Sequence, residues 1–332
     1  MSIYSFISEY FFRAKDIVEK FNPNNQVLLQ FFQRKERAIL AGMDEVLELL
    51  KVWLKGKNVQ IRYLPEGTEI GEKEVVLELE GRYQDFGIYE GLIDGILARS
   101  TSIATNAKLC LEASNGKEVI CMSDRADHYS NQIRDGRAMY VGGITSFSSL
   151  AQAPNASCKI YGSIPHALIQ NFKGDVIKVM ELYLTLFPNE PLILLADFHN
   201  DVIDDSLKVL RVFGEKLFGV RVDTSKNMKD NMFYKKEEEF GVTPVQIKKL
   251  REALDNNGGK HVKIFVSSGF DAEKIKYFED ENTPVDAYGV GEALLKVNNT
   301  FSADAVKIDG IALAKAGREY QENSKLKVFK WE

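Results

Sequence analysis

The chain has 332 residues, 45% of them hydrophobic and 27% charged, which is the composition of an ordinary globular protein with one large or two medium domains. Its net charge of -5 argues against a nucleic-acid partner and against binding to an anionic membrane. The three cysteines include no Cys-x-x-Cys pair, which argues against disulfides and structural zinc. No apolar run approaches the roughly 18 residues of a membrane span, and the N-terminus lacks the basic start of a signal peptide. We therefore expect a soluble, cytoplasmic protein.

The N-terminal part of the chain mixes helical and strand patterns. Apolar residues at helical spacing predict a helix over residues 5–20. A second helical block is expected next, with the apolar positions Phe31, Phe32, Ala38, Met43, Val46, Leu49 and Leu50. Strand patterns follow at 59–64 and 75–80, and small residues at helical spacing predict a long helix over 87–112.

From residue 118 to about 295, short apolar runs alternate with helical segments. The runs lie at 119–122, 159–161, 192–196, 219–222, 262–266 and 285–288. The helical segments between them include 175–185, 204–217, 244–256 and 271–279. This alternation is typical of βα units with a parallel sheet, arranged as a barrel or as a doubly wound sheet.

The C-terminal tail returns to strand patterns. Residues 301–308 alternate weakly, Asp309-Gly310 is a hairpin signal, and 311–313 and 326–329 are further strand candidates. Because the tail resembles the strand-rich N-terminal region, we expect it to pack there. The predicted domains are 1–112 with 296–332, and 113–295.

Polar residues follow the apolar runs of the second domain. These strand ends are 123–125, 162–163, 197–199, 221–224, 267–269 and 289–291. In a (β/α) barrel, ligands bind at the carboxyl ends of the strands, so these positions are the candidates for a site.

Asp197 and Asp223 end successive predicted strands. Two carboxylates at one mouth of a barrel can hold Mg²⁺ on a polyphosphate, but each aspartate can equally cap the helix that follows. Arg125, Arg137 and Arg221 suit a carboxylate or phosphate ligand, with a surface salt bridge as the alternative for each.

Glycine turns and histidines complete the candidates. The turns at 267–271 and 289–292 lead into helices, where backbone N–H groups can bind a phosphate, although the glycines can also serve only tight turns. His166 stands where a strand gives way to a helix, a position that suits a ligand or a structural role. The roles of His128 and His199 stay open, and His261 precedes a strand, away from the expected site.

Eight motifs keep a common order along nearly the whole chain. They are Tyr10-Phe11-x-Arg13, 135–138 with 140–143, 162–167, 220–224, 264–269, 286–291, 301–304 and Lys315-x-Gly317-Arg318. With these motifs the chain resembles the nicotinate phosphoribosyltransferases of the type II phosphoribosyltransferase class.

The resemblance implies an irregular α/β TIM-like barrel, plus an α/β N-terminal domain completed by the C-terminal tail. It also implies a head-to-tail homodimer with active sites at the subunit interface. The reaction of the family joins nicotinate to 5-phosphoribosyl pyrophosphate with Mg²⁺, giving nicotinate mononucleotide and pyrophosphate. Many members couple it to ATP hydrolysis through a phosphorylated histidine, which matches His166 here.

The resemblance also assigns residues. His166, Asp197 and Asp223 are the expected catalytic residues, and the two aspartates are the expected metal ligands. Substrate binding is assigned to Tyr10, Arg13, Arg125, Arg137, Ser163, Arg221, Ser267, Ser268, Gly269, Gly289 and Gly291. In this assignment Tyr10 of the partner subunit stacks on the pyridine ring and Arg125 pairs with its carboxylate.

Some positions depart from the family pattern and keep alternatives open. Phe198 and Glu292 stand where the family has smaller polar residues, which motivates a catalytically silent nucleotide-binding homologue as an alternative. Asp124 and Asp127 make the surroundings of Arg125 acidic, which disfavours quinolinate and is the best support for nicotinamide as the base.

Overall fold

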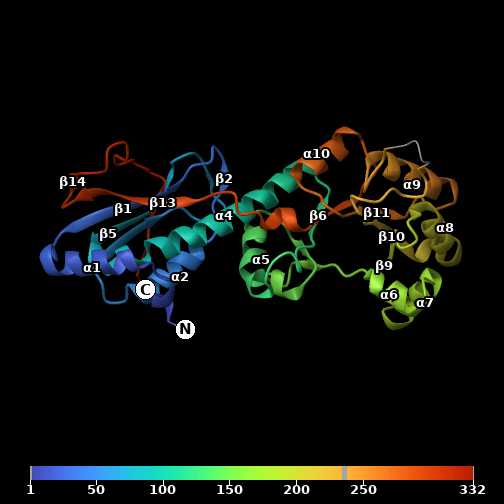
Figure 1. The fold of residues 1–332 in the computed structure, drawn as a ribbon, viewed down its shortest axis with the longest axis horizontal. Helices are drawn as coiled ribbons and strands as arrows, with labels where there is room; N and C mark the ends of the chain where they lie inside the picture. The colour runs from blue at the N-terminus through green and yellow to red at the C-terminus, as the bar shows by residue number, and fades with distance from the viewer. Residues whose placement is uncertain (1, 234–237, 332) are drawn as a thin grey trace. The chain divides into compact units, whose positions relative to one another are not determined.

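The computed structural model describes residues 2–233 and 238–331 (Figure 1). It divides into two compact units, 1–105 with 296–332 (unit 1) and 106–295 (unit 2). The first boundary falls inside helix α4 (Glu90–Ala113). None of the described helices is both long and apolar enough to cross a membrane.

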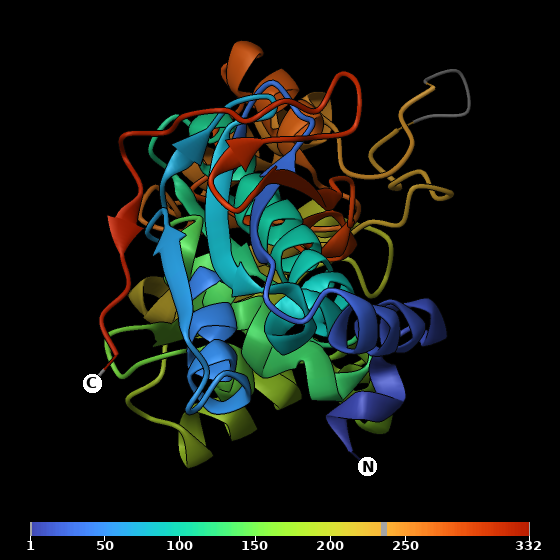
Figure 2. The same ribbon diagram turned by 90° about the vertical axis from the view of Figure 1, so that its left-hand side faces the viewer.

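Unit 1 is built on a six-stranded antiparallel sheet with the order β14-β13-β1-β5-β3-β15. Its strands are β1 (Gln26–Gln33), β3 (Val59–Tyr63), β5 (Val75–Arg82), β13 (Phe301–Ile308), β14 (Ile311–Ala312) and β15 (Lys327–Val328). A separate pair joins β2 (Ala38–Ile39) to β4 (Glu69–Ile70). The C-terminal strands, red in Figure 2, thus belong to the same sheet as the blue and cyan strands, so the tail completes the first domain as expected.

The helices of unit 1 are η1 (Ile3–Phe6), α1 (Glu9–Phe21), α2 (Met43–Trp53), α3 (Tyr83–Phe86), η2 (Gly87–Tyr89) and the first part of α4. All of them except η1 contribute buried apolar residues to the core that also contains the sheet. Along α2 the buried residues are Met43, Val46, Leu47 and Leu50, the spacing that places side chains on one helical face.

The expected helical block from Phe31 to Leu50 is wrong in its first part. Phe31 and Phe32 lie in β1, and Ala38 lies in β2. β1 is a central strand and is buried on both faces, so its apolar residues show no alternation. A short apolar run without alternation cannot be distinguished from a buried helix by periodicity.

Unit 2 contains a seven-stranded parallel sheet with the order β8-β7-β6-β12-β11-β10-β9. The strands are β6 (Glu118–Cys121), β7 (Ser146–Phe147), β8 (Lys159–Ile160), β9 (Leu192–Leu195), β10 (Leu217–Val222), β11 (Lys263–Val266) and β12 (Ala287–Val290). Each neighbouring pair is consecutive in the sequence, except that β12 returns to β6. This is the strand order of a barrel that is open between β8 and β9, which confirms the expected fold class.

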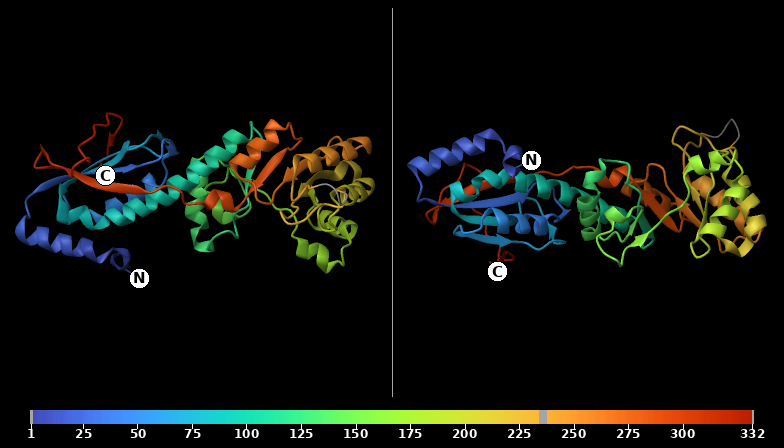
Figure 3. Two further views of the ribbon diagram at one scale, coloured as in Figure 1. Left: turned by 45° about the horizontal axis from the view of Figure 1, so that its top comes forward. Right: turned by 90° about the horizontal axis from the view of Figure 1, so that it is seen from below.

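Helices follow the strands of unit 2 (Figure 3). They are α5 (Gln132–Val141), α6 (His166–Asn171), α7 (Val176–Leu186), α8 (Val202–Phe213), α9 (Pro244–Asn256) and α10 (Ala272–Asp280), with the short turns η3 (Tyr129–Asn131), η4 (Leu150–Gln152), η5 (Gly214–Lys216) and η6 (Glu292–Leu295). Asp201, Thr243 and Asp271 begin α8, α9 and α10, because each side chain accepts a hydrogen bond from an N–H of the first turn.

Two carboxylates near the start of α4 are partly buried, one helical turn apart. The pKa of Glu90 is raised to about 7, chiefly by burial and then by the charge of Asp304. The pKa of Asp94 is raised to about 7 by burial and by the charge of Glu90. The Oδ1 atom of Asp94 is buried and has no hydrogen-bond partner among the described residues. Each carboxylate therefore destabilises the folded chain when it is ionised.

We expect Asp94→Asn to raise the melting temperature at pH 8 by roughly 2–4 °C, and by much less at pH 4. Because the folded-state pKa lies above the ordinary value of 3.8, stability is greatest below pH 3.8 and falls as the pH rises to about 7. Thermal unfolding followed by circular dichroism at the two pH values measures the difference. Glu48→Gln, which removes an exposed carboxylate of α2, is the control. A lower melting temperature of Asp94→Asn at pH 8 would contradict this prediction.

Candidate functional site

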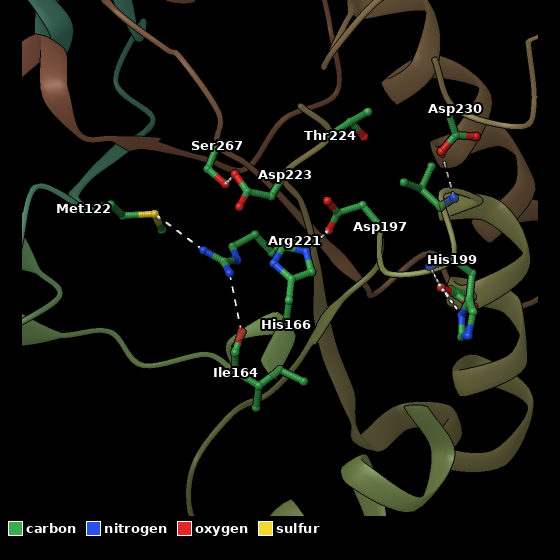
Figure 4. Close-up of polar contacts among 12 residues, drawn as sticks. Met122, Ile164, His166, Asp197, His199, Arg221, Asp223, Thr224, Asp230 and Ser267 are labelled. Atoms are coloured by element: carbon green, nitrogen blue, oxygen red, sulfur yellow. Dashed lines mark hydrogen bonds and ion pairs between the residues drawn. The ribbon is translucent and has the colours of Figure 1, made fainter. Parts of the chain in front are cut away.

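His166 and Asp197 meet at the carboxyl edge of the unit 2 sheet. His166 is the first residue of α6, and Asp197 lies two residues beyond β9. Nε2 of His166 lies 3.2 Å from Oδ1 of Asp197 (Figure 4). The histidine side chain is 46% exposed and the aspartate side chain 9% exposed, so the pair combines a buried acid with an accessible imidazole.

Asp223 lies close to this pair and is fixed by the next strand. It follows β10 directly, and its Oδ1 accepts a hydrogen bond of 2.7 Å from the hydroxyl of buried Ser267, which follows β11. Neither Asp197 nor Asp223 caps a helix, because Asp201 and Thr243 occupy those positions. The capping alternative is therefore wrong for both.

The charge of Asp223 acts on the carboxyl group of Asp197. Burial raises the pKa of Asp197, the neighbouring His166 opposes this shift, and the negative charge of Asp223 adds to it. A shared site for two like charges favours either a bound proton or a bound cation. The pair thus has the electrostatic property expected of a cation site.

The donor set fits Mg²⁺. No group of three or more His, Cys, Asp or Glu side chains in the described ranges is arranged to hold a metal ion. Mg²⁺ does not require such a cage, since it is commonly bound through one or two carboxylates together with waters and substrate phosphates. Asp197 and Asp223 supply two carboxylates of this kind.

Arg221 brings a positive charge to the same place. Its Nη2 lies 3.5 Å from the carbonyl oxygen of Ile164, and its Nη1 lies 3.9 Å from the sulfur of Met122. Its Nε is buried and has no hydrogen-bond partner within the described part of the chain. A buried donor without an acceptor is costly, so the guanidinium is suited to an anionic ligand. We call His166, Asp197, Arg221, Asp223 and Ser267 the carboxyl-edge cluster.

The loop from Tyr161 to His166 is held at three points. The hydroxyl of Tyr161 donates to Oε2 of Glu118 at 2.7 Å, on β6. Arg221 donates to the Ile164 carbonyl, and Asp197 contacts His166. These contacts join the loop to β6, β10 and β9, across the edge where β8 and β9 are not paired.

Tyr161→Phe is expected to lower the free energy of unfolding by about 1–2 kcal/mol, because it removes a hydrogen bond to a carboxylate that is only partly solvated. Urea denaturation measures the change. Tyr277→Phe is the control, since that ring is 54% exposed and its hydroxyl forms no hydrogen bond within the described residues. Equal stability of Tyr161→Phe and the native chain would show that the loop does not depend on this contact.

The turn after β11 has an unusual backbone. Ser268 and Gly269 both have positive φ angles, 77° and 70°. Glycine adopts this conformation freely, whereas serine does so at a cost. Gly289 lies inside β12, and a Cβ there would lie 2.5 Å from the sulfur of Met122 and 3.1 Å from Cβ of Ser267. Gly289 thus permits close packing under the turn, and Gly291 follows the strand.

Several of the predicted site residues are not part of the carboxyl-edge cluster. Arg125 and Arg137 are exposed, and Ser163 is half-buried; none of the three forms a side-chain hydrogen bond or ion pair in the described ranges. Tyr10 and Arg13 lie on α1 of unit 1, where Tyr10 is 63% exposed and Arg13 is 3.7 Å from Glu9.

The other histidines have structural contacts. His199 bonds to the buried carboxylate of Asp205 at 2.8 Å, and His128 accepts from the backbone N–H of Ser130. His261 contacts the carbonyl of Gly214 at the amino end of the strands, as expected. There it lines a groove of about 570 Å³ together with Leu192 and Phe218.

The motif at 135–138 has a packing role. A Cβ on Gly136 would lie 2.0 Å from the carbonyl oxygen of Gln152, so no larger residue fits where α5 meets η4. Gln152 in turn donates to the hydroxyl of Ser123, just beyond β6. Gly136 therefore allows the close packing that places Gln152 against Ser123 at the end of β6.

Sequence reasoning missed Met122 and Glu118. Met122 is the residue that follows β6, so the rule applied to the other strand ends applies to it as well. Glu118 begins β6, where a carboxylate is usually a surface residue. Its contact with Tyr161 depends on strand pairing and has no signal in the sequence.

Comparison with known proteins gives one family model and several similar proteins. Residues 10–101 match the family model described as the N-terminal domain of quinolinate phosphoribosyl transferase. The solved nicotinate-nucleotide pyrophosphorylase from Pyrococcus furiosus is 31% identical with a TM-score of 0.85, over 98% of this chain and 82% of that chain.

Two curated relatives come from Mycobacterium tuberculosis. Nicotinate phosphoribosyltransferase pncB1 is 27% identical over 258 residues, which are 75% of this chain and 53% of the relative. Nicotinate phosphoribosyltransferase pncB2 is 23% identical over 280 residues, which are 82% of this chain and 56% of the relative. The chain spans about half the length of the curated relatives it matches.

Proposed function

Because the chain belongs to the nicotinate phosphoribosyltransferase-type family, we propose that it transfers the phosphoribosyl group of 5-phosphoribosyl pyrophosphate to nicotinate, giving nicotinate mononucleotide and pyrophosphate in NAD salvage. The observation that carries the proposal is the carboxyl-edge cluster. Two neighbouring carboxylates and a guanidinium with an unpaired N–H suit a magnesium-bound polyphosphate.

The reaction breaks the bond between ribose C1 and the pyrophosphate oxygen, and the ring nitrogen of nicotinate supplies the electron pair of the new C1–N bond. Mg²⁺, held by Asp197 and Asp223, would neutralise the departing pyrophosphate. Arg221 binds a phosphate oxygen and stabilises the charge that accumulates as the bond breaks. Ser267 keeps the Asp223 carboxylate in place through its 2.7 Å hydrogen bond.

His166 is the proposed link to ATP. The Asp197 carboxylate accepts from Nε2–H of the imidazole, which leaves the lone pair on Nδ1. Nδ1 then attacks the γ-phosphorus of ATP, the bond to the β-phosphate oxygen breaks, and ADP leaves with its electron pair. The accessible ring of His166 supports this role.

The pyridine base requires residues beyond the cluster. We assign Arg125 to the nicotinate carboxylate, because its exposed guanidinium has no partner among the described residues. Tyr10 and Arg13 enter the proposal through a homodimer, in which exposed Tyr10 of one copy stacks on the base bound to the other.

Quinolinate is the second candidate base, favoured by the quinolinate phosphoribosyl transferase match of residues 10–101. Nicotinamide loses part of its support, because the carboxylates of Asp124 and Asp127 already accept hydrogen bonds from Ser148 and Asn131. A silent homologue, motivated by Phe198 and Glu292, would bind phosphoribosyl pyrophosphate without turnover.

Product formation tests the proposal. The chain is incubated with phosphoribosyl pyrophosphate, Mg²⁺ and nicotinate, nicotinamide or quinolinate, with and without ATP, and products are identified by mass spectrometry. We expect nicotinate mononucleotide from nicotinate alone, at a rate that ATP increases. The same product from quinolinate with release of CO₂ would establish the second candidate, and no product from any base would favour the silent homologue.

A further inference from the structure

Lys274 lies beneath the turn that follows β11. It is the third residue of α10, whose cap Asp271 accepts a hydrogen bond of 2.9 Å from the Lys274 backbone N–H. Its Nζ donates to the carbonyl oxygen of Ser268 at 3.2 Å. The ammonium also lies 4.3 Å from the ring centre of Phe270 and 5.9 Å from that of Phe278.

This ammonium is not an ordinary surface charge. It forms no ion pair within the described residues, and burial lowers its pKa while the charge of Asp271 opposes the shift. Aromatic faces and one carbonyl oxygen replace the water that a lysine normally keeps. The chain thus places a partly desolvated cation directly behind a turn that faces the carboxyl edge.

The hydrogen bond from Lys274 fixes one peptide plane. In a trans peptide, the carbonyl of one residue and the N–H of the next point in opposite directions. Because the Ser268 carbonyl is directed to Lys274, the N–H of Gly269 is directed away from it. The N–H groups of Ser268, Gly269 and Phe270 donate no hydrogen bond within the described ranges, so they have no competing acceptor.

The same bond stabilises a strained residue. Ser268 has a φ angle of 77°, a conformation that costs a residue with a side chain on the order of 1 kcal/mol or more. Without the hydrogen bond from Lys274 to the Ser268 carbonyl, this conformation of the turn is less stable. A strained residue that the surrounding structure maintains is a common feature of ligand sites.

We infer that Lys274 is a positioning residue of the phosphate subsite: it holds the Ser268 carbonyl so that the Gly269 N–H is presented to the 5-phosphate of phosphoribosyl pyrophosphate. This inference rests on the proposed function. Lys274 does not touch the substrate; its cation adds to the positive potential behind the phosphate and its hydrogen bond fixes the turn.

Calorimetric titration with ribose 5-phosphate and, separately, with pyrophosphate tests this role. Lys274→Met removes the donor and charge and keeps most of the side-chain length. We expect it to weaken ribose 5-phosphate binding about tenfold, since a hydrogen bond with a charged donor and the turn it fixes are lost. Pyrophosphate, titrated in the presence of Mg²⁺, should change its affinity less than about twofold, because Arg221 and the Mg²⁺ on the two aspartates bind that group.

Lys276→Met is the matched control, since Lys276 is an exposed lysine on the same helix that pairs with Asp280. It should leave both affinities unchanged. Equal ribose 5-phosphate affinity of Lys274→Met and the native chain would overturn the inference. Equal weakening of both ligands would also overturn it, because a general loss of structure acts on both.

If Lys274→Met does not fold, Lys274→Gln replaces it, since its amide keeps a donor but not the charge. We then expect about threefold weaker ribose 5-phosphate binding in a folded variant, and unchanged binding overturns the inference. Failure of the native chain to bind either ligand is a different result. It would remove the proposed function itself, and with it the premise of the inference.

Discussion

Asp223→Asn is expected to lower kcat/KM for phosphoribosyl pyrophosphate by about 10²- to 10³-fold. The amide has the shape of the carboxylate, and its oxygen can still accept the hydrogen bond from Ser267. What the variant loses is the negative charge that holds the magnesium-bound pyrophosphate. Steady-state assays over a range of Mg²⁺ concentrations measure the loss and should show a weaker response to the ion.

The same substitution is also expected to change the pKa of Asp197. The charge of Asp223 contributes to the raised pKa of Asp197, so Asp223→Asn should lower that pKa and move the acidic limb of the pH–rate profile to lower pH. Asp280→Asn removes an exposed carboxylate on α10 and is the control. Activity of Asp223→Asn within threefold of the native chain would exclude a role for this carboxylate in turnover.

Arg221→Met is expected to lower kcat/KM by roughly 100-fold, through a higher KM for phosphoribosyl pyrophosphate and a lower kcat, because the guanidinium both binds a phosphate and stabilises the charge on the leaving group. Methionine fills similar space but cannot donate to a phosphate. Arg221→Lys keeps the charge and loses the planar pair of donors, so we expect a smaller loss, about tenfold.

The KM for nicotinate should change little in either Arg221 variant. Arg211→Met, which removes an exposed arginine of α8, should behave as the native chain. If Arg221→Met lowered thermal stability without changing the KM for phosphoribosyl pyrophosphate, the unpaired guanidinium would be a structural feature and not a ligand group.

The architecture of unit 2 was predictable from the sequence because its pattern is local. Short apolar runs and periodic helices recur over many residues, and each strand pairs with its neighbour in the chain. The rule that ligands bind at carboxyl strand ends then selects Asp197, Asp223 and Ser267, which the structure places at one edge. The hairpin at Asp309-Gly310 was equally local and is present, with φ angles of 51° and 77°.

Features set by non-local contacts were not predictable. β1 lies between β5 and β13 and is buried on both faces, and the burial of both faces explains its apolar run without alternation. β7 is two residues long, too short to form a pattern. The contact of Arg221 with Ile164 and that of Lys274 with Ser268 join a side chain to a backbone oxygen, which any residue possesses.

Glycine is needed for different physical reasons at different positions of this chain. Gly269 has a positive φ angle and open space around the position of a Cβ, so its backbone conformation alone favours glycine. Gly136 and Gly289 are required because neighbouring atoms occupy the space of a side chain. In the sequence all three stand in motifs and look alike.

A crystal structure of the chain with phosphoribosyl pyrophosphate and Mg²⁺ is the most direct test of the carboxyl-edge cluster as the phosphoribosyl site. We expect the 5-phosphate at the 267–269 turn, the metal on the carboxylates of Asp197 and Asp223, and the pyrophosphate bound by Arg221. Ligand density instead in the groove of Leu192, Phe218 and His261, at the opposite end of the strands, would contradict the assignment of the site.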